Sequence, residues 1–530
     1  MRIIYINGVI DTITNGLKEA FVVENKKFIY VGSTKEALQY QTKESKIVDL
    51  QQKYVTAGFN DSHMHVLNYG YTLTMCPLTK VKSITELKQA LKAYIQKEKI
   101  TKGAFVKGRG WNHDFFEDEK RFPTRQDLDD VSLDHPILIT RTCGHIAICN
   151  TKALEIFDID ENTPQVEGGY FDVKTGVFKE NAIDLINAKM PQPTVEQIKE
   201  MLKRAFKSLN QYGITSAQSD DLLVFGNYHD ILEAYHQLEQ EQAMSVKIYE
   251  QSHFTSLESL KQFIDEGYHT GVGNDYFKIG PLKMMADGSL GARTALLLEP
   301  YQDDQTTKGI QVYDTQTLNE MVDYASYHGM QVAIHAIGDG ALEMVLQAYE
   351  NTLAKHPRSN HRHGVVHCQI SNPSQLERFK NLQLQAYIQS IFLDYDVLIV
   401  KDRVGKRANS SYAFKTFYDF NHASNGSDCP VELPDVLKGM QCAITRCSTR
   451  GIGPYLPNQA LRIHEALQSF TLNGAYAPFE EKVKGSIEVD KVADFVVLSE
   501  NLHQIDPFKL VEVDVLKTYV DGNCVYAKEE

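Results

Sequence analysis

The pattern of apolar and polar positions divides the chain into two β-rich ends and a long middle. Near the start, RIIYINGVIDT, AFVVENKKFIYVG and SKIVDLQQKYVTAGF alternate as strands do, with turn signals at Asn7-Gly8 and Asn25-Lys26. Near the end, KGSIEVDKVADFVVLSENL and LVEVDVLKTYVDGNCVYAKEE do the same, with Asp521-Gly522 as a hairpin turn. Residues 1–53 and 476–530 are therefore predicted to pair into one small β-sandwich.

The middle of the chain alternates short β-runs with helical stretches, which is typical of βαβ units around a parallel sheet. Eight candidate strands end near His65, Gln218, Gln251, Asp287, His335, His367, Gln389 and Asp428. Eight such units predict an α/β fold with a closed (β/α)₈ TIM barrel in residues 54–475. About residues 70–195 separate the first strand from the second, which is too long for a crossover and predicts an inserted subdomain after the first barrel strand.

Composition narrows the choice of partners and compartment. A chain of 530 residues with a net charge of −14 and no Lys/Arg-rich block lacks the clustered basic face that a nucleic acid requires. There is no apolar run of about 18 residues and no signal-peptide pattern, so we expect no membrane partner. The 8 cysteines lack paired CxxC spacing, which fits a reducing cytoplasm. A homodimer is the default expectation for assembly.

His63-Met64-His65 is the first candidate for chemistry. Side chains at positions i and i+2 of a strand point the same way, so both imidazoles are presented to one point, as chelation of a metal requires. The pair alone is weak evidence, because polar residues near a strand end are common.

Further metal-type side chains end later strands of the predicted barrel. His335 follows QVAI, His367 follows HGVV, Asp428 closes NGSD, and Lys283 lies in PLKMMADGS. A single histidine after an apolar strand is often a hydrogen-bonded core residue. The carboxyl ends of barrel strands converge, however, so the joint pattern predicts one metal site.

These motifs resemble the amidohydrolase superfamily, and more closely its branch of N-substituted formamide deformylases and YtcJ-like proteins. The resemblance is carried by GFNDSHMH, LKMMADGSLGARTA, VAIHAIGDGA and NGSDCPV, by GRGWNHDFF, FPTRQDLD and TRTCGHIAICNTKAL in the insertion, and by GSIEVDKVADFVVL near the end. It spans nearly the whole chain, and it is more specific for family than for substrate.

The resemblance implies a site with two divalent metal ions. His63 and His65 would bind one ion, His335 and His367 the other, and Asp428 would bind the first ion and shuttle protons. Lys283 would bridge both ions as a carbamate formed with carbon dioxide, because an ammonium cannot ligate a cation. The alternative is an unmodified Lys283 paired with Asp287. Zinc suits imidazole and carboxylate ligands in a hydrolytic site.

The implied activity is metal-dependent hydrolysis of a non-peptide amide C–N bond in a small molecule, of the N-formyl or N-acyl amine type, by metal-activated hydroxide. Asp428 and His367 are expected catalytic residues, with His145 as a donor to the substrate carbonyl. A cyclic amidase or a deaminase would use the same centre. A regulatory or binding protein that lost turnover is a third reading, against which the intact ligand set argues.

Other residues carry weaker expectations. His145, Trp111 and Arg293 are candidates for a substrate pocket, whereas the alternatives are a structural histidine, an anchor of the insertion, and an ion pair of Arg293 with Asp287. Asp339 either orients His335 or caps a helix. Cys143, Cys368 and Cys429 lie near the predicted site, but no neighbouring residue suggests a nucleophilic thiol, so they receive no role.

Overall fold

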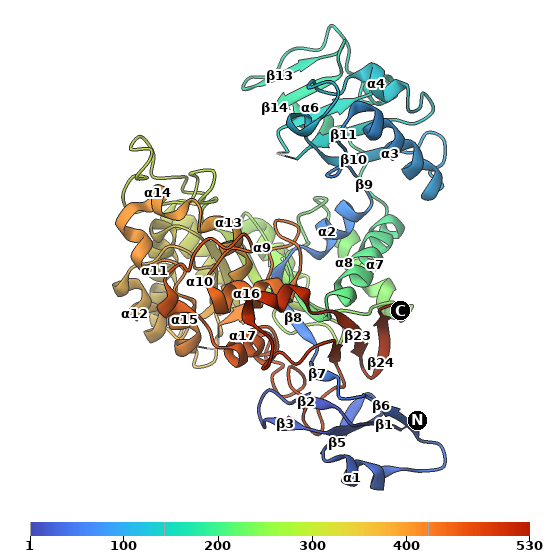
Figure 1. The fold of residues 1–530 in the computed structure, drawn as a ribbon. Coiled ribbons are helices and arrows are strands. Elements are labelled where there is room, and N and C mark those ends of the chain that lie inside the picture. Colours follow the sequence, from blue (N-terminus) through green and yellow to red (C-terminus); the bar gives the residue numbers. More distant parts are fainter. Residues whose placement is uncertain (1, 143, 422, 530) are drawn as a thin grey trace. The chain divides into compact units, whose positions relative to one another are not determined.

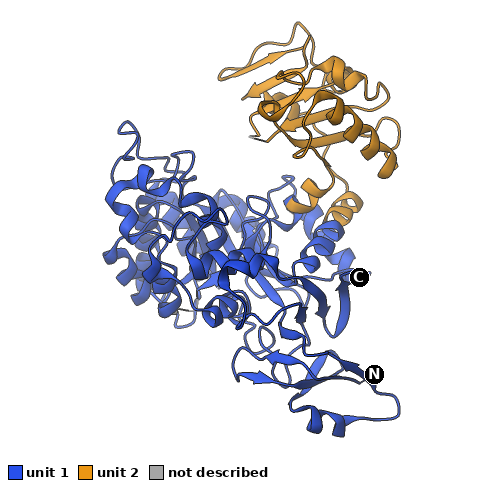
Figure 2. Cartoon of the chain, viewed as in Figure 1, with its two compact units in different colours: residues 1–68, 202–530 blue, residues 69–201 orange. Residues whose placement is uncertain are grey.

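The computed structural model describes residues 2–142, 144–421 and 423–529, so Cys143 lies outside the described residues. The chain forms two compact units (Figure 2). One contains residues 1–68 and 202–530, and the other contains residues 69–201.

The first unit is built around a parallel sheet of eight strands. In sheet order these are β8 (Phe59–Met64), β15 (Ile214–Ser219), β16 (Lys247–His253), β17 (Phe277–Met285), β18 (Val332–Ala336), β19 (Gly364–His367), β20 (Gln385–Ile388) and β21 (Ser424–Asn425). Just past β21, the Asp428 N–H donates to the His63 carbonyl (2.8 Å), and the His65 N–H donates to the Cys429 carbonyl (2.8 Å). These bonds join the last strand to the first, so the predicted TIM-barrel-like fold is confirmed.

Helices follow most of these strands (Figure 1). They are α7 (Val195–Gln211), α8 (Tyr228–Gln240), α9 (Leu257–Asp265), α10 (Thr315–Tyr327), α11 (Asp339–Lys355), α12 (Pro373–Asn381), α15 (Phe414–Asn421) and α16 (Val436–Thr445), with α2 (Val66–Leu73), α13 (Leu393–Asp396), α14 (Val400–Val404), α17 (Ile463–Ser469) and α18 (Leu472–Tyr476) between them. Asn227, Ser256 and Asn372 cap the N-termini of α8, α9 and α12. Such caps satisfy otherwise unpaired N–H groups and fix where each strand-to-helix loop ends.

Two further sheets of the first unit contain the terminal segments. A four-stranded sheet has the order β5 (Lys27–Gly32), β4 (Ala20–Glu24), β1 (Ile3–Ile6), β6 (Lys46–Asp49). A six-stranded sheet has the order β24 (Asn523–Ala527), β23 (Val515–Val520), β22 (Phe495–Leu498), β7 (Tyr54–Ala57), β2 (Val9–Asp11), β3 (Leu17–Lys18). The ring of Tyr5 in one sheet lies 5.3 Å from that of Phe495 in the other, so aromatic packing joins them. Strand β7 belongs to the six-stranded sheet, and β8 of the barrel begins two residues later.

The second unit has its own sheet and core. The sheet order is β13 (Gly169–Asp172), β14 (Val177–Glu180), β12 (Ile146–Cys149), β11 (Ile137–Arg141), β10 (Val106–Trp111), β9 (Cys76–Pro77). Its helices are α3 (Ile84–Lys97), α4 (Arg125–Asp129), α5 (Thr151–Ile156) and α6 (Ile183–Asn187). Across the described parts of both units, no helix is long and apolar enough to cross a bilayer.

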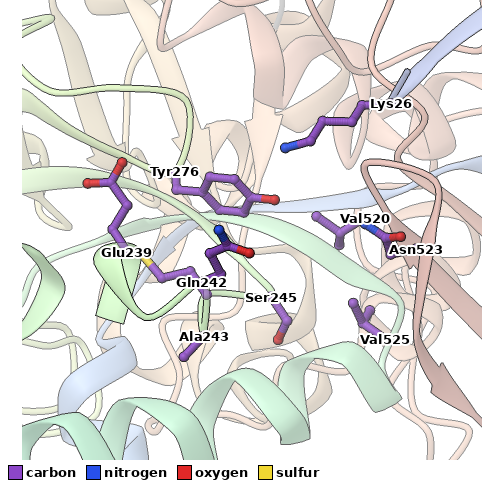
Figure 3. A pocket seen from close by; sticks show the side chains of 10 residues that line it. Lys26, Glu239, Gln242, Ala243, Ser245, Tyr276, Val520, Asn523 and Val525 are labelled. Atoms are coloured by element: carbon purple, nitrogen blue, oxygen red, sulfur yellow. The ribbon is translucent and has the colours of Figure 1, made fainter. Parts of the chain in front are cut away.

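A cavity of about 520 Å³ lies at the amino ends of barrel strands β16 and β17 (Figure 3). Lys26, Tyr276 and Asn523 are among its lining residues. Its lysine is already paired, because Asp521 lies 3.0 Å from the Lys26 amine and also accepts a hydrogen bond from the Tyr276 hydroxyl (2.8 Å). Barrel enzymes carry their chemistry at the opposite, carboxyl ends of the strands, so this cavity is separate from the candidate site.

Candidate metal centre

A buried carboxylate fixes the first and last barrel strands against each other. Asp61 Oδ1 accepts hydrogen bonds from the backbone N–H groups of His63 (3.2 Å) and Ser427 (3.1 Å), and Oδ2 accepts from the Ser427 hydroxyl (2.5 Å). Burial raises the pKa of Asp61 to about 7. Through this contact, His63 of β8 and Asp428, which follows β21, lie beside each other at the carboxyl ends of the barrel strands.

His63, His65 and Asp428 converge on one point. Oδ1 of Asp428 lies 3.3 Å from Nε2 of His63 and 3.1 Å from Nε2 of His65. The three ligand atoms lie within 4.8 Å of one another. Nδ1 of His63 lies 2.7 Å from the Gln251 side-chain oxygen, and Nδ1 of His65 lies 3.0 Å from the Asp220 carbonyl. Because these acceptors require the proton on Nδ1, both Nε2 lone pairs are directed at the Asp428 carboxylate.

Two lone pairs and a carboxylate in one place repel unless a positive charge lies between them. In the metal-free protein a proton can supply this charge. Burial opposes charging of the His65 ring, but the Asp428 and Asp220 carboxylates outweigh it and raise the pKa of His65 to about 9. Burial and the nearby Lys283 lower the pKa of His63. Burial opposes ionisation of Asp428, yet the neighbouring rings of His63 and His65 hold its pKa well below the usual range. This donor set fits a divalent cation.

His335 and His367 form a second pair beside the first three residues. Their ring centroids are 4.3 Å apart, and the His367 ring lies 5.5 Å from that of His63. Nε2 of His335 lies 3.1 Å from the Gly288 carbonyl, which places the proton on Nε2 and leaves a lone pair on Nδ1. Nδ1 of His367 is buried and has no hydrogen-bond partner among the described residues. Burial and the nearby His335 hold the pKa of His367 well below its usual value, so its ring stays neutral.

Backbone strain is concentrated at this centre. His367, Cys368 and Asp428 have φ values of 79°, 51° and 58°, in the left-handed region that residues other than glycine rarely adopt. Such strain persists where surrounding contacts determine the conformation, and it often marks functional positions.

Lys283 lies fully buried in β17, and its partner differs from the expected alternative. Its amine lies 3.4 Å from Oδ2 of Asp220, not beside Asp287. The two oxygens of Asp287 instead accept the backbone N–H groups of Ile337 (3.0 Å) and Gly338 (2.8 Å), and Oδ1 lies 3.2 Å from Nε2 of His335. Asp287 therefore orients His335, the role considered for Asp339.

Asp339, Arg293 and two cysteines near the centre have partners or surroundings other than the candidate ligands. Asp339 lies in the first turn of α11 and accepts the Leu298 N–H (3.0 Å), whereas the described polar contacts of His335 are with Asp287 and Gly288. Arg293 pairs with Asp303 (2.9 Å) and not with Asp287. Cys368 and Cys429 are buried, and burial raises the pKa of both thiols well above the usual value.

The remaining candidates lie in the second unit. Trp111 is fully buried in the hydrophobic core of this unit. This is the position expected if it anchors the insertion. His145 is exposed, and its Nδ1 lies 2.9 Å from a Glu180 carboxylate oxygen. A contact of His145 with substrate stays a prediction.

Sequence reasoning missed Asp61, Asp220 and Gln251. Asp61 stands in GFNDSHMH two residues before the first histidine, and Gln251 ends the third predicted strand. Both positions could have been found by extending the strand-end argument to residues that orient ligands, because a metal-binding histidine nearly always donates its second ring N–H to a fixed acceptor.

The sequence as a whole identifies the family of the chain. A model of the Amidohydrolase family matches residues 46–526. The chain belongs to the amidohydrolase family. Putative amidohydrolase YtcJ of Bacillus subtilis is 33% identical over 522 residues, covering 96% of each chain. N-substituted formamide deformylase of Arthrobacter pascens is 23% identical and covers 97% of this chain and 96% of that protein.

A solved structure agrees with this assignment. An uncharacterized metal-dependent hydrolase from Pyrococcus horikoshii is 31% identical, with a TM-score of 0.80, over 96% of this chain and 99% of that one. This amidohydrolase is therefore a metal-dependent hydrolase acting on C–N bonds of small molecules, with a His-His-Asp group able to hold a metal.

Proposed function

We propose that this amidohydrolase cleaves an acyclic amide of the N-formyl or N-acyl amine type. The observation that carries the proposal is the single carboxylate of Asp428, which faces both His63 and His65 at the barrel rim. One relative named N-substituted formamide deformylase, similar over nearly the full length, supports this substrate class.

The proposed centre holds two divalent ions, with zinc as the expected metal. His63, His65 and Asp428 would hold one ion, and His335 and His367 the other. Lys283 would join them after its neutral amine reacts with carbon dioxide to give a carbamate and a released proton. When bound, such ions lower the pKa of water and polarise a carbonyl oxygen.

Asp428 is the proposed proton carrier. As a carboxylate at the strand ends, it can accept a proton from the attacking water. It then delivers that proton to the leaving nitrogen, because an amine anion is a very poor leaving group. His367 stays neutral, and its ring lies 5.5 Å from that of His63, within reach of the same reacting group.

A substrate profile tests this function. Protein loaded with zinc is incubated with N-formyl and N-acetyl amines, and release of formate or acetate is measured. Carboxylate release supports the proposal. Ring opening of cyclic amides or release of ammonia would replace it with a cyclic amidase or a deaminase, and absence of turnover across all these compounds would favour a binding protein.

A further inference from the structure

His253 is the last residue of β16 and lies beside the proposed centre. In the parallel pair of β16 and β17 it is the register partner of Lys283. Both side chains approach the same carboxylate oxygen, since Oδ2 of Asp220 lies 3.3 Å from Nδ1 of His253 and 3.4 Å from the Lys283 amine. His253 therefore belongs to the same ring of strand ends as the candidate metal ligands.

Asp220 fixes the position of the His253 ring. Its carbonyl oxygen accepts the Nδ1 proton of His65 (3.0 Å), while its carboxylate faces His253 and Lys283. One residue thus sets the geometry of side chains from the first, third and fourth barrel strands. Because the carboxylate faces Nδ1, the other ring nitrogen of His253, Nε2, is the one left for a ligand.

Structural histidines of this barrel behave differently from His253. His361 uses both ring nitrogens, contacting the Leu382 carbonyl (3.0 Å) and the His363 N–H (2.9 Å). His363 also uses both, with Ser326 (3.1 Å) and the Val332 N–H (3.0 Å). Nε2 of His253 has no hydrogen-bond partner in the described part of the chain, and the side chain keeps 12% of its surface exposed. With Nδ1 turned to Asp220 and the side chain partly exposed, Nε2 is the His253 atom that can reach a molecule bound at the strand ends.

We propose that His253 contacts the acyl half of the amide substrate through Nε2 and that Asp220 is its positioning residue. This inference rests on the proposed amide hydrolysis. Asp428 follows β21 and serves the leaving nitrogen, whereas β16 lies three strands away around the ring, towards the opposite wall. A substrate with its nitrogen at Asp428 therefore directs its carbonyl and acyl group towards His253.

The test compares His253→Phe with the wild-type protein, both loaded with zinc, on two series of amide substrates. One series keeps the amine and varies the acyl group from formyl to acetyl to propionyl, and the other keeps the formyl group and varies the amine. Phenylalanine keeps the ring volume and removes the hydrogen bond. We expect kcat/KM to fall about 10- to 100-fold, with altered ratios in the acyl series and unchanged ratios in the amine series.

Controls separate this role from a structural one. His236→Phe, at an exposed position on α8, should match the wild type. Metal content and unfolding temperature of His253→Phe should also match, and His253→Gln, which keeps a polar end, should recover part of the activity.

Three outcomes would overturn the inference: wild-type kinetics in both series, an equal loss across both series, or loss of metal from His253→Phe. Wild-type protein that hydrolyses none of these amides would instead remove the proposed function, and this inference with it.

Discussion

Asparagine at position 428 would remove the negative charge while keeping a similar size and one carbonyl oxygen. That oxygen can occupy the position of Oδ1, which lies 3.1 Å from Nε2 of His65 and 3.3 Å from Nε2 of His63. The loop itself is held by the bonds from Ser427 to Asp61, which do not involve residue 428. We therefore expect Asp428→Asn protein to fold and to retain most of its metal.

The expected loss lies in the chemical step. An amide can neither accept the proton of the attacking water nor deliver it to the leaving nitrogen. A positioned acid–base group contributes about 10²- to 10⁴-fold, which corresponds to about 3–5 kcal/mol of activation free energy. Nearly all of this loss should appear in kcat, with KM changed little, because the group acts in the transition state.

The assay measures carboxylate release from an N-formyl amine together with metal per chain by elemental analysis. Asp435→Asn is a matched control, because Asp435 caps α16, where asparagine caps equally well. Full activity of Asp428→Asn would refute the role of Asp428 as proton carrier. Loss of metal in step with activity would show that its charge serves binding instead.

Three further predictions concern the ligands and their support. Lys283→Ala should lower the metal content per chain. Added short carboxylic acids should restore part of it, because their oxygens replace those of the carbamate. Unchanged metal loading would rule out a bridging carbamate. Gln251→Leu should weaken metal binding about 10- to 100-fold, because Nδ1 of His63 loses the acceptor that orients its ring. If competition with a chelator gives this variant the same metal affinity as the wild type, Gln251 serves packing alone. Metal affinity should rise between pH 6.5 and about 9, because His65, with its pKa raised to about 9, must release a proton to bind. By linkage, the same proton stabilises the metal-free fold fully below pH 6.5, and this stabilisation is lost as the pH rises through about 9. A binding titration that is flat across this window would contradict both statements.

The barrel could be read from the sequence because short β-type runs alternate with helical stretches, and several of these runs end in a histidine or an aspartate. The same pattern could not place the boundary at Gly58. YVTAGFNDSHM reads as one unbroken β-type stretch, yet β7 pairs with β22 and β8 pairs with β15. Alternation reports which face of a strand is buried, not which sheet the strand joins.

The sequence also could not predict which distant residues contact one another. The partner of Lys283 is Asp220, 63 residues away, whereas Asp287 is close in sequence but faces His335. His253 stands two residues beyond Gln251, where the apolar run of the third strand had already ended. Metal-type residues were visible because their chemistry is distinctive, but the residues that orient them depend on strand order and register.

The seam held by Asp61 has a consequence for biosynthesis. Since His65 and Asp428 are separated by 363 positions, a growing polypeptide possesses no complete His-His-Asp group until its last barrel strand has emerged and docked. An ion captured there would act as a late clasp between the beginning and the end of the barrel, adding stability in proportion to the logarithm of its free concentration. Chains cut short before this seam would lack Asp428 and could not complete the group that retains the ion.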